Sequence, residues 1–273
     1  MGTLSDFAEN AVVKHLTREA AYSPAATIYL ALCTGDPTDT GTGASMNEVS
    51  NGNNYARTAV TLGAASSRRV TQSGTVTFPQ ASGSWGTISH WAIVTSGTYG
   101  SGDLLASGSL SVNKFVVNGN TPSVASSEVW VEITASTGLS TYAANAMLDR
   151  MFRNQAFTIA ANYLGVATAT LSDETTGSTV TEPSGNNYSR LAINASGGAQ
   201  PSWAAASGNS VTNANAWIMP TPSGSWGTVV AGFIVDASSA GNILMYDNGV
   251  TDQAVASGDT VQYGSSAFSF SQS

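Results

Sequence analysis

The sequence predicts a mainly β protein of two tandem domains, each an antiparallel β-sandwich or partly open barrel with a leading α-helix. Two repeated motifs reveal the duplication. Ser-Gly-Ser-Trp-Gly-Thr occurs at residues 82–87 and again at 223–228, and Asn-Asn-Tyr-Ala-Arg at 53–57 returns as Asn-Asn-Tyr-Ser-Arg at 186–190. The third observation indicates the fold class: short apolar runs alternate with turns rich in Gly, Ser and Asn, which is typical of all-β domains.

The two copies define the predicted domain boundaries. The motifs recur at a spacing of roughly 135 residues, which is an ordinary size for one domain and enough to bury a core. We therefore predict a first unit at residues 1–135 and a second, diverged copy at residues 136–273. The joint between them falls near residues 135–138, a short segment of small residues.

Each copy begins with a predicted helix, at residues 4–16 and 139–151. Apolar residues recur there at three- and four-residue spacing and form one apolar stripe. Thr3 and Asp6 fit a capping box before the first helix. A lone helix in a β-rich domain must bury its stripe against a sheet, in its own chain or in a neighbouring copy. The helix residues that we expect at such an interface are Phe7, Ala11, Tyr142 and Met147.

Short strands and long polar loops follow in the same order in both copies. The loops at residues 34–50 and 169–183 lack any periodic pattern, and loops of that length are often functional or interface segments. The apolar runs that predict strands are 27–33, 59–62, 76–79, 88–94, 103–106 and 128–134 in the first copy, and 163–168, 217–220, 229–235, 242–246 and 267–270 in the second.

Composition and charge exclude several classes of function. Only 10% of residues are charged, and the net charge of −8 comes from 9 basic and 17 acidic residues. Without a basic patch to neutralise phosphates, we expect no binding to nucleic acid. No apolar stretch approaches the ~20 residues of a membrane span, so we expect no membrane partner. Cys33 is the single cysteine, so no disulfide can form within the chain.

The repeated aromatic and basic residues are the candidate sites. Trp85 and Trp226 could be stacking platforms for a ligand, together with Tyr55 and Tyr188, but glycines beside a tight turn favour rings that cap the core. Each tyrosine is followed two positions later by an arginine, so the two side chains share a strand face. These arginines could grip a carboxylate ligand; we favour an internal pair with an acidic residue or loop carbonyls. They are Arg57 and Arg190.

Few residues have the spacing that catalysis or metal binding requires. His15 and His90 have no cysteine or second histidine near them in sequence, which argues against zinc. Residues 36–41 carry the carboxylates and glycine of a loose calcium loop but lack its regular ligand spacing, so a turn is favoured. The chain also lacks a Gly-x-Ser-x-Gly elbow, a phosphate loop and an evident carboxylate pair. We expect no catalytic residue, no cofactor and no metal, and hence no enzyme.

Several segments of the first copy resemble a family of small virion proteins of tailed bacteriophages, often labelled tail fibre or structural proteins. The resemblance rests on residues 5–11, 27–39, 54–57 and 84–87 and covers most of residues 4–110. The second copy retains the helix, residues 187–190 and the Trp226 turn but lacks the Cys-Thr-Gly-Asp-Pro segment. The family is usually a single unit, so the duplication is a departure, and no catalytic residues come with the resemblance.

This resemblance implies a non-enzymatic structural protein on the surface of the phage particle, assembled in the host cytoplasm. The expectation that we rank first is a capsid decoration or cement protein held by protein–protein contacts. The alternative is a tail fibre or a receptor- or carbohydrate-binding module, and a polysaccharide hydrolase ranks below both. The expected partners are other virion proteins (major capsid or tail proteins), copies of the same chain and, in the alternative, a host surface glycan.

Overall fold

The computed structural model describes residues 2–134 and 138–272, so most of the predicted joint lies outside it. The chain forms two compact units that interleave along the sequence. Unit 1 comprises Met1–Glu9, Ser23–Ile133 and Asn145–Ala156, and unit 2 comprises Asn10–Tyr22, Thr134–Ala144 and Phe157–Ser273. The predicted division at residues 135 and 136 stays a prediction about the sequence repeat, because each compact unit also takes up part of a helix from the other side of that boundary.

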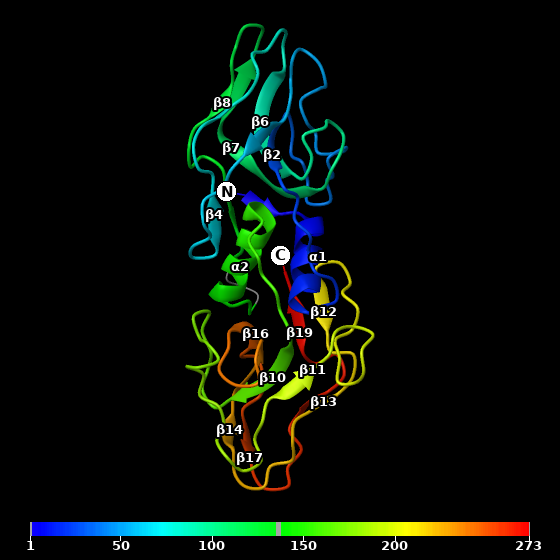
Figure 1. Ribbon diagram of the computed structural model, residues 1–273, viewed down its shortest axis with the longest axis vertical. Coiled ribbons are helices and arrows are strands. Elements are labelled where there is room, and N and C mark those ends of the chain that lie inside the picture. The colour runs from blue at the N-terminus through cyan, green and yellow to red at the C-terminus, as the bar shows by residue number, and fades with distance from the viewer. Residues whose placement is uncertain (1, 135–137, 273) are drawn as a thin grey trace. The chain divides into compact units, whose positions relative to one another are not determined.

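Unit 1 is built on a seven-stranded sheet in the order β3-β2-β6-β7-β1-β9-β4, which curls into a half-barrel (Figure 1). All its ladders are antiparallel except the short parallel pair of β1 and β9. Strands β5 and β8 form a separate pair. The strands are β1 (Gly2–Leu4), β2 (Ile28–Cys33), β3 (Thr58–Val60), β4 (Arg69–Thr71), β5 (Val76–Thr77), β6 (Gly86–Val94), β7 (Leu104–Val116), β8 (Ser123–Val124) and β9 (Trp130–Glu132).

Unit 2 has a four-stranded antiparallel sheet in the order β11-β10-β15-β16 (Figure 1). Three two-stranded pairs accompany it: β12 with β19, β13 with β18, and β14 with β17. The strands are β10 (Asn162–Ala167), β11 (Leu191–Ile193), β12 (Ser210–Thr212), β13 (Trp217–Ile218), β14 (Gly227–Val229), β15 (Ala231–Val235), β16 (Ile243–Asp247), β17 (Gln253–Val255), β18 (Gln262–Tyr263) and β19 (Ser269–Ser271). The predicted fold class, mainly β with two tandem repeats and a helix at the start of each repeat, is confirmed.

Each unit buries a core cluster against its central strands, and β2, β10 and β15 are buried along almost their whole length. In unit 1 the cluster is Ala31, Cys33, Met46, Ala92, Val94 and Leu104. In unit 2 it is Ala167, Leu171, Ala231, Phe233, Val235 and Ile243. Gly165 allows Phe233 into the second cluster, because a Cβ at Gly165 would lie 2.2 Å from the ring. The core therefore occupies the same place in both units. In unit 1 it is filled there by two alanines, Ala31 and Ala92, and in unit 2 by Phe233 beside Gly165.

The two helices are α1 (Asp6–Leu16) and α2 (Thr141–Arg153). Each is capped by the serine before it: the Ser5 hydroxyl accepts the Ala8 N–H at 3.3 Å, and the Ser140 hydroxyl accepts the Ala143 N–H at 3.1 Å. The predicted helices began two residues too early, and the predicted capping box is wrong because Thr3 lies in β1. Residues 2–4 pair with β7 instead of starting the helix.

The helices are divided between the units. Residues of α1 from Asn10 onward belong to unit 2, where the His15 ring bonds the Phe157 carbonyl at 3.0 Å and accepts the Tyr22 N–H at 3.0 Å. Residues of α2 from Asn145 onward belong to unit 1, where the Asp149 carboxylate accepts the Ala65 N–H at 2.8 Å. The second part of each helix therefore completes the unit that holds most of the other repeat.

The predicted helix interface residues differ in burial. Met147 is fully buried and Ala11 is half-buried, whereas Phe7 and Tyr142 are exposed by 41% and 42%. Within unit 2 the Tyr142 ring meets Phe157 edge-on, with ring centroids 6.0 Å apart. Neither helix, within the described part of the chain, has the length and apolar character that crossing a membrane demands.

Candidate functional site

Arg57 lies at the centre of a buried polar cluster in unit 1, which we call the arginine clamp. Its Nε and Nη2 each donate to one oxygen of the Glu48 carboxylate at 2.8 Å, the bidentate geometry that suits a planar guanidinium. Its Nη atoms also donate to backbone carbonyls of two loops, those of Gly43, Ser96, Thr98 and Ser101, over 2.7–2.9 Å. Both side chains are almost completely buried, so the clamp fixes the loop of residues 34–50 to the turn after β6.

The same clamp recurs in unit 2 around Arg190. Its Nε and Nη2 donate to Glu182 at 3.0 and 2.5 Å. Its Nη atoms donate to the carbonyls of Gly177, Ala237 and Ala240 over 2.7–2.9 Å. The long polar loop of each unit is therefore tied down by a buried ion pair, and neither guanidinium is directed at a free surface where it could grip a carboxylate ligand.

A tyrosine and a tryptophan complete each clamp. The Tyr55 hydroxyl donates to Glu48 at 2.8 Å and accepts the Leu32 N–H at 3.0 Å, while its ring meets Trp85 edge-on at 5.2 Å. The Trp85 indole N–H donates to the Asn53 carbonyl at 2.9 Å. The same contacts occur around the second carboxylate with the residues Tyr188, Glu182, Trp226 and Asn186.

Burial decides what these aromatic residues can do. Trp85 and Trp226 are only 5% and 4% exposed, so no sugar can stack on their faces in this conformation. Burial, followed by the neighbouring Glu48, raises the pKa of Tyr55, and burial together with Glu182 raises the pKa of Tyr188. Both phenols consequently remain protonated hydrogen-bond donors. This geometry serves the internal structure of each unit.

The other titratable candidates have simple surroundings. Burial, then the nearby Glu48, raises the pKa of the Cys33 thiol, so it stays protonated in the core. His90 contacts the Ser89 hydroxyl through its Nδ1 at 2.8 Å. Carboxylate oxygens of Asp6, Glu9 and Asp39 lie within 4.8 Å of one another at the start of α1. Burial and the Asp6 charge raise the pKa of Asp39, as expected for carboxyl groups that lie close together and repel one another.

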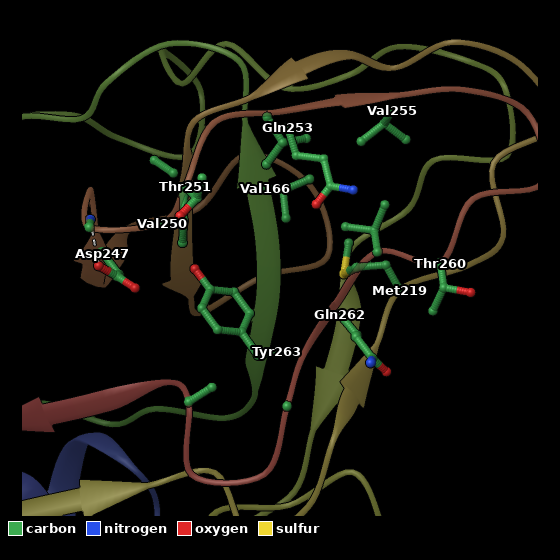
Figure 2. A pocket seen from close by; sticks show the side chains of 16 residues that line it. Val166, Met219, Asp247, Val250, Thr251, Gln253, Val255, Thr260, Gln262 and Tyr263 are labelled. Atoms are coloured by element: carbon green, nitrogen blue, oxygen red, sulfur yellow. Dashed lines mark hydrogen bonds between the residues drawn. The ribbon is translucent and has the colours of Figure 1, made fainter.

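A groove of about 520 Å³ opens on unit 2 between β10, β15, β17 and β18 (Figure 2). Figure 2 shows the Tyr263 ring standing in the middle of it, with Val166 and Met219 on the walls. The polar groups around it are Asp247, Thr251, Gln253, Thr260 and Gln262. Burial, then the Asp247 charge, raises the pKa of Tyr263, so its hydroxyl is protonated at neutral pH.

Unit 1 has a groove of about 410 Å³ at the equivalent place. The strand ladders establish the equivalence. Lys114 on β7 pairs with Ile88, and Gln253 on β17 pairs with the matching Val229. In the same way Val124 pairs with Val76 on β5, and Tyr263 pairs with Trp217 on β13. Corresponding wall residues of the two grooves are Leu32 and Val166, Ile88 and Val229, and Val116 and Val255.

The lining of the two grooves has diverged. Val124 of unit 1 is replaced by Tyr263 in unit 2, and Lys114 by Gln253. Phe115, which is 67% exposed beside the first groove, corresponds to Ala254. The first groove is thus bordered by exposed apolar side chains and charges, and the second by neutral polar side chains, an acid and an aromatic ring.

Sequence reasoning missed both the acid of each clamp and the grooves. An acidic residue precedes the arginine by nine positions in the first copy and by eight in the second, and this near-repeat was the available signal for Glu48 and Glu182. The grooves had no such signal, because their walls come from strands far apart in sequence. Tyr263 lies in a two-residue strand and was not among the predicted site residues.

A duplicated β unit whose repeated charges and aromatic rings all serve its internal packing defines a repeated structural domain. A family model described as "Podophage GP4 fiber I protein gp80" matches residues 3–132 and again residues 138–271. The chain therefore belongs to this family of phage fibre structural proteins and carries its unit twice, which confirms the resemblance and the tandem duplication. Comparison with curated proteins finds no match.

Proposed function

We propose that the chain is a non-enzymatic subunit of a fibre on the virion, attached to the particle by protein–protein contacts. The observation that carries this proposal is the match of a phage fibre family to both repeats. A capsid decoration protein, which the sequence alone ranked first, is the second candidate. The low charge and small side chains that suit close packing between copies support either location.

The attachment surface that we propose is the end of β7 in unit 1, with a virion protein as its occupant. Val112, Phe115 and Val117 are exposed by 66%, 67% and 40%, and they lie within six residues of one another. Single exposed apolar residues are ordinary, but a cluster of large ones is typical of an interaction site. Unit 2 has Thr251, Ala254 and Ala256 in the corresponding positions, so this character is specific to the first copy.

The proposed absence of catalysis follows from how the buried acids are used. Glu48 and Glu182 receive hydrogen bonds on both carboxylate oxygens from an arginine and a further one from a tyrosine. Each of these carboxylates is thus already engaged on both oxygens by donors of its own unit rather than by a substrate. The most strongly built polar sites of the chain are therefore structural.

Incorporation of variant chains into particles tests the proposal. Phage carrying Phe115→Ser together with Val112→Ser should assemble particles that lack this chain or lose it on purification. Ile218→Ser is the matched control, because Ile218 is an exposed apolar strand residue of unit 2 (53% exposed). Full retention of the double variant would contradict attachment through this surface, and absence of the native chain from purified particles would contradict the virion role.

A further inference from the structure

We propose that the groove of unit 2 is a binding site for a neutral saccharide of one or two sugar residues. The groove is the one described above, with Tyr263 in its middle and Asp247, Gln253 and Gln262 among its polar lining (Figure 2). The biological meaning of such binding, adhesion to a glycan surface, rests on the proposed fibre function. The binding itself rests only on the geometry of unit 2.

Tyr263 is the first observation behind this proposal. The side chain is half-buried, so part of its ring faces the groove, while its Oη is enclosed and interacts with the Asp247 carboxylate. A ring anchored in this way offers an apolar surface against which the C–H groups of a sugar can pack. The chain makes room for this side chain, because a Cβ at Gly232 would lie 2.1 Å from the Tyr263 Oη.

The lining chemistry identifies the ligand class. Asp247 supplies a carboxylate, Gln253 and Gln262 supply amides that both donate and accept, and threonine hydroxyls stand at the edge. None of the described residues lining the groove is basic, so an anionic ligand would meet Asp247 without a compensating cation. An apolar ligand would leave the polar groups unpaired. A polyhydroxylated neutral ligand satisfies both conditions, with its C–H faces against Tyr263 and Met219.

The size and shape of the groove agree with a small sugar. Its volume of about 520 Å³ lies within the range of about 300–1,000 Å³ that ligand pockets usually have. In Figure 2 the Tyr263 hydroxyl is directed toward the side where Thr251 and Asp247 lie. An aromatic face beside hydrogen-bonding groups is amphipathic in the same sense as a pyranose ring.

Unit 1 provides an internal comparison. At the position of Tyr263 it has Val124. At the position of Gly232 it has Trp91, since Trp91 pairs with Leu32 across β2 and β6 in the same way as Gly232 pairs with Val166 across β10 and β15. The large aromatic side chain is therefore Trp91 on the central strand β6 in unit 1, and Tyr263 on β18 at the groove in unit 2. The first groove has no phenol and carries Lys114 and Glu128 instead, so we assign saccharide binding to unit 2 alone.

The test uses the full-length chain and calorimetric titration with four neutral disaccharides: maltose, lactose, mannobiose and chitobiose. Saturable binding of at least one is expected, with affinity reduced about tenfold or more by Tyr263→Ala. Val124→Ala, at the corresponding place in unit 1, is the control and should leave the affinity unchanged. No binding of any of the four at about 10 mM, or equal loss in both variants, overturns the proposal.

A second variant separates the ring from its hydroxyl. Tyr263→Phe keeps the ring and removes only the enclosed hydroxyl, so saccharide affinity should change little, whereas Tyr263→Ala removes the packing surface and should lose it. Unchanged affinity in both Tyr263 variants would place the sugar elsewhere and overturn the site. These results are independent of particle composition, so a chain that binds sugar but is absent from virions contradicts the fibre function and leaves the groove assignment standing.

Discussion

The guanidinium of Arg57 and the carboxylate of Glu48 form two parallel hydrogen bonds of 2.8 Å inside unit 1. The pair closes a long polar loop over the sheet, and unit 2 repeats it with Arg190 and Glu182. A β unit with so few charged residues uses its buried charges to fix loop geometry. This arrangement is suited to a rigid structural subunit.

Breaking the clamp should be costly. Glu48→Gln leaves the buried Arg57 guanidinium without its counter-ion, and losing one partner of a buried pair costs about 3–5 kcal/mol in the free energy of unfolding. Thermal and denaturant unfolding measure the effect. Glu182→Gln should cost less, because the Glu182 side chain is 17% exposed against 4% for Glu48. Equal stability of Glu48→Gln and the native chain would show that the pair is not structural.

The carboxyl cluster at the start of α1 should make stability depend on pH. Burial and Asp6 raise the folded pKa of Asp39 above its unfolded value, so the folded state binds more protons between the two values. Stability contributed by this group is therefore present at low pH and falls as pH rises through the folded pKa. Asp39→Asn should raise the unfolding midpoint at pH 7 and have little effect near pH 2, where the carboxyl is protonated in both states. A stabilisation that is equal at both pH values would refute this.

The shared helices should transmit damage to the unit that they complete. Leu16 is fully buried at the end of α1, within unit 2, so Leu16→Ala should cost about 2–5 kcal/mol through lost contacts and a cavity. Amide hydrogen exchange should show the loss of protection in β10 and β11 first. The reciprocal variant is Met147→Ala in α2, which should affect β2 and β3 of unit 1. Loss confined to the strands of the helix's own repeat would contradict the interleaved units.

Cys33 should be inert while the chain is folded. Its thiol is fully buried, and burial raises its pKa, so almost no reactive thiolate is present at neutral pH. A thiol reagent such as DTNB should label it only as fast as unit 1 opens, with complete reaction in denaturant. Rapid stoichiometric labelling of the native chain would contradict the burial.

The sequence predicted the longer elements well because each has enough apolar residues to reveal its buried surface, as a stripe in a helix or as a continuous run in a central strand. The stripe through Ala8, Val12 and Leu16 is buried, and the apolar run at residues 28–33 is β2. It missed several strands of two or three residues, such as β12 and β18, because they have no measurable period, although the predicted runs at 76–79 and 217–220 do contain β5 and β13. It also missed most of β7, since Val112 and Phe115 belong to a strand whose end is exposed rather than half-buried.

The site residues also differ in whether a local sequence pattern reveals them. Arg57 and Trp85 were found because they recur in a repeated motif, but Glu48 lies in a loop whose pattern differs between the copies. The exchange of helix ends has no signal in sequence, since a stripe such as that of Met147 fits either unit. Tyr263 and Gly232 are partners only through the fold, so no local pattern connects them.

The copy number of this chain in purified particles, calibrated by mass against the major shell protein, tests the fibre assignment most directly. A fibre attached at a symmetric collar or tail position should give about six to thirty copies per particle, and an averaged image should place them there. Hundreds of copies spread over the shell would contradict the fibre role and support capsid decoration instead.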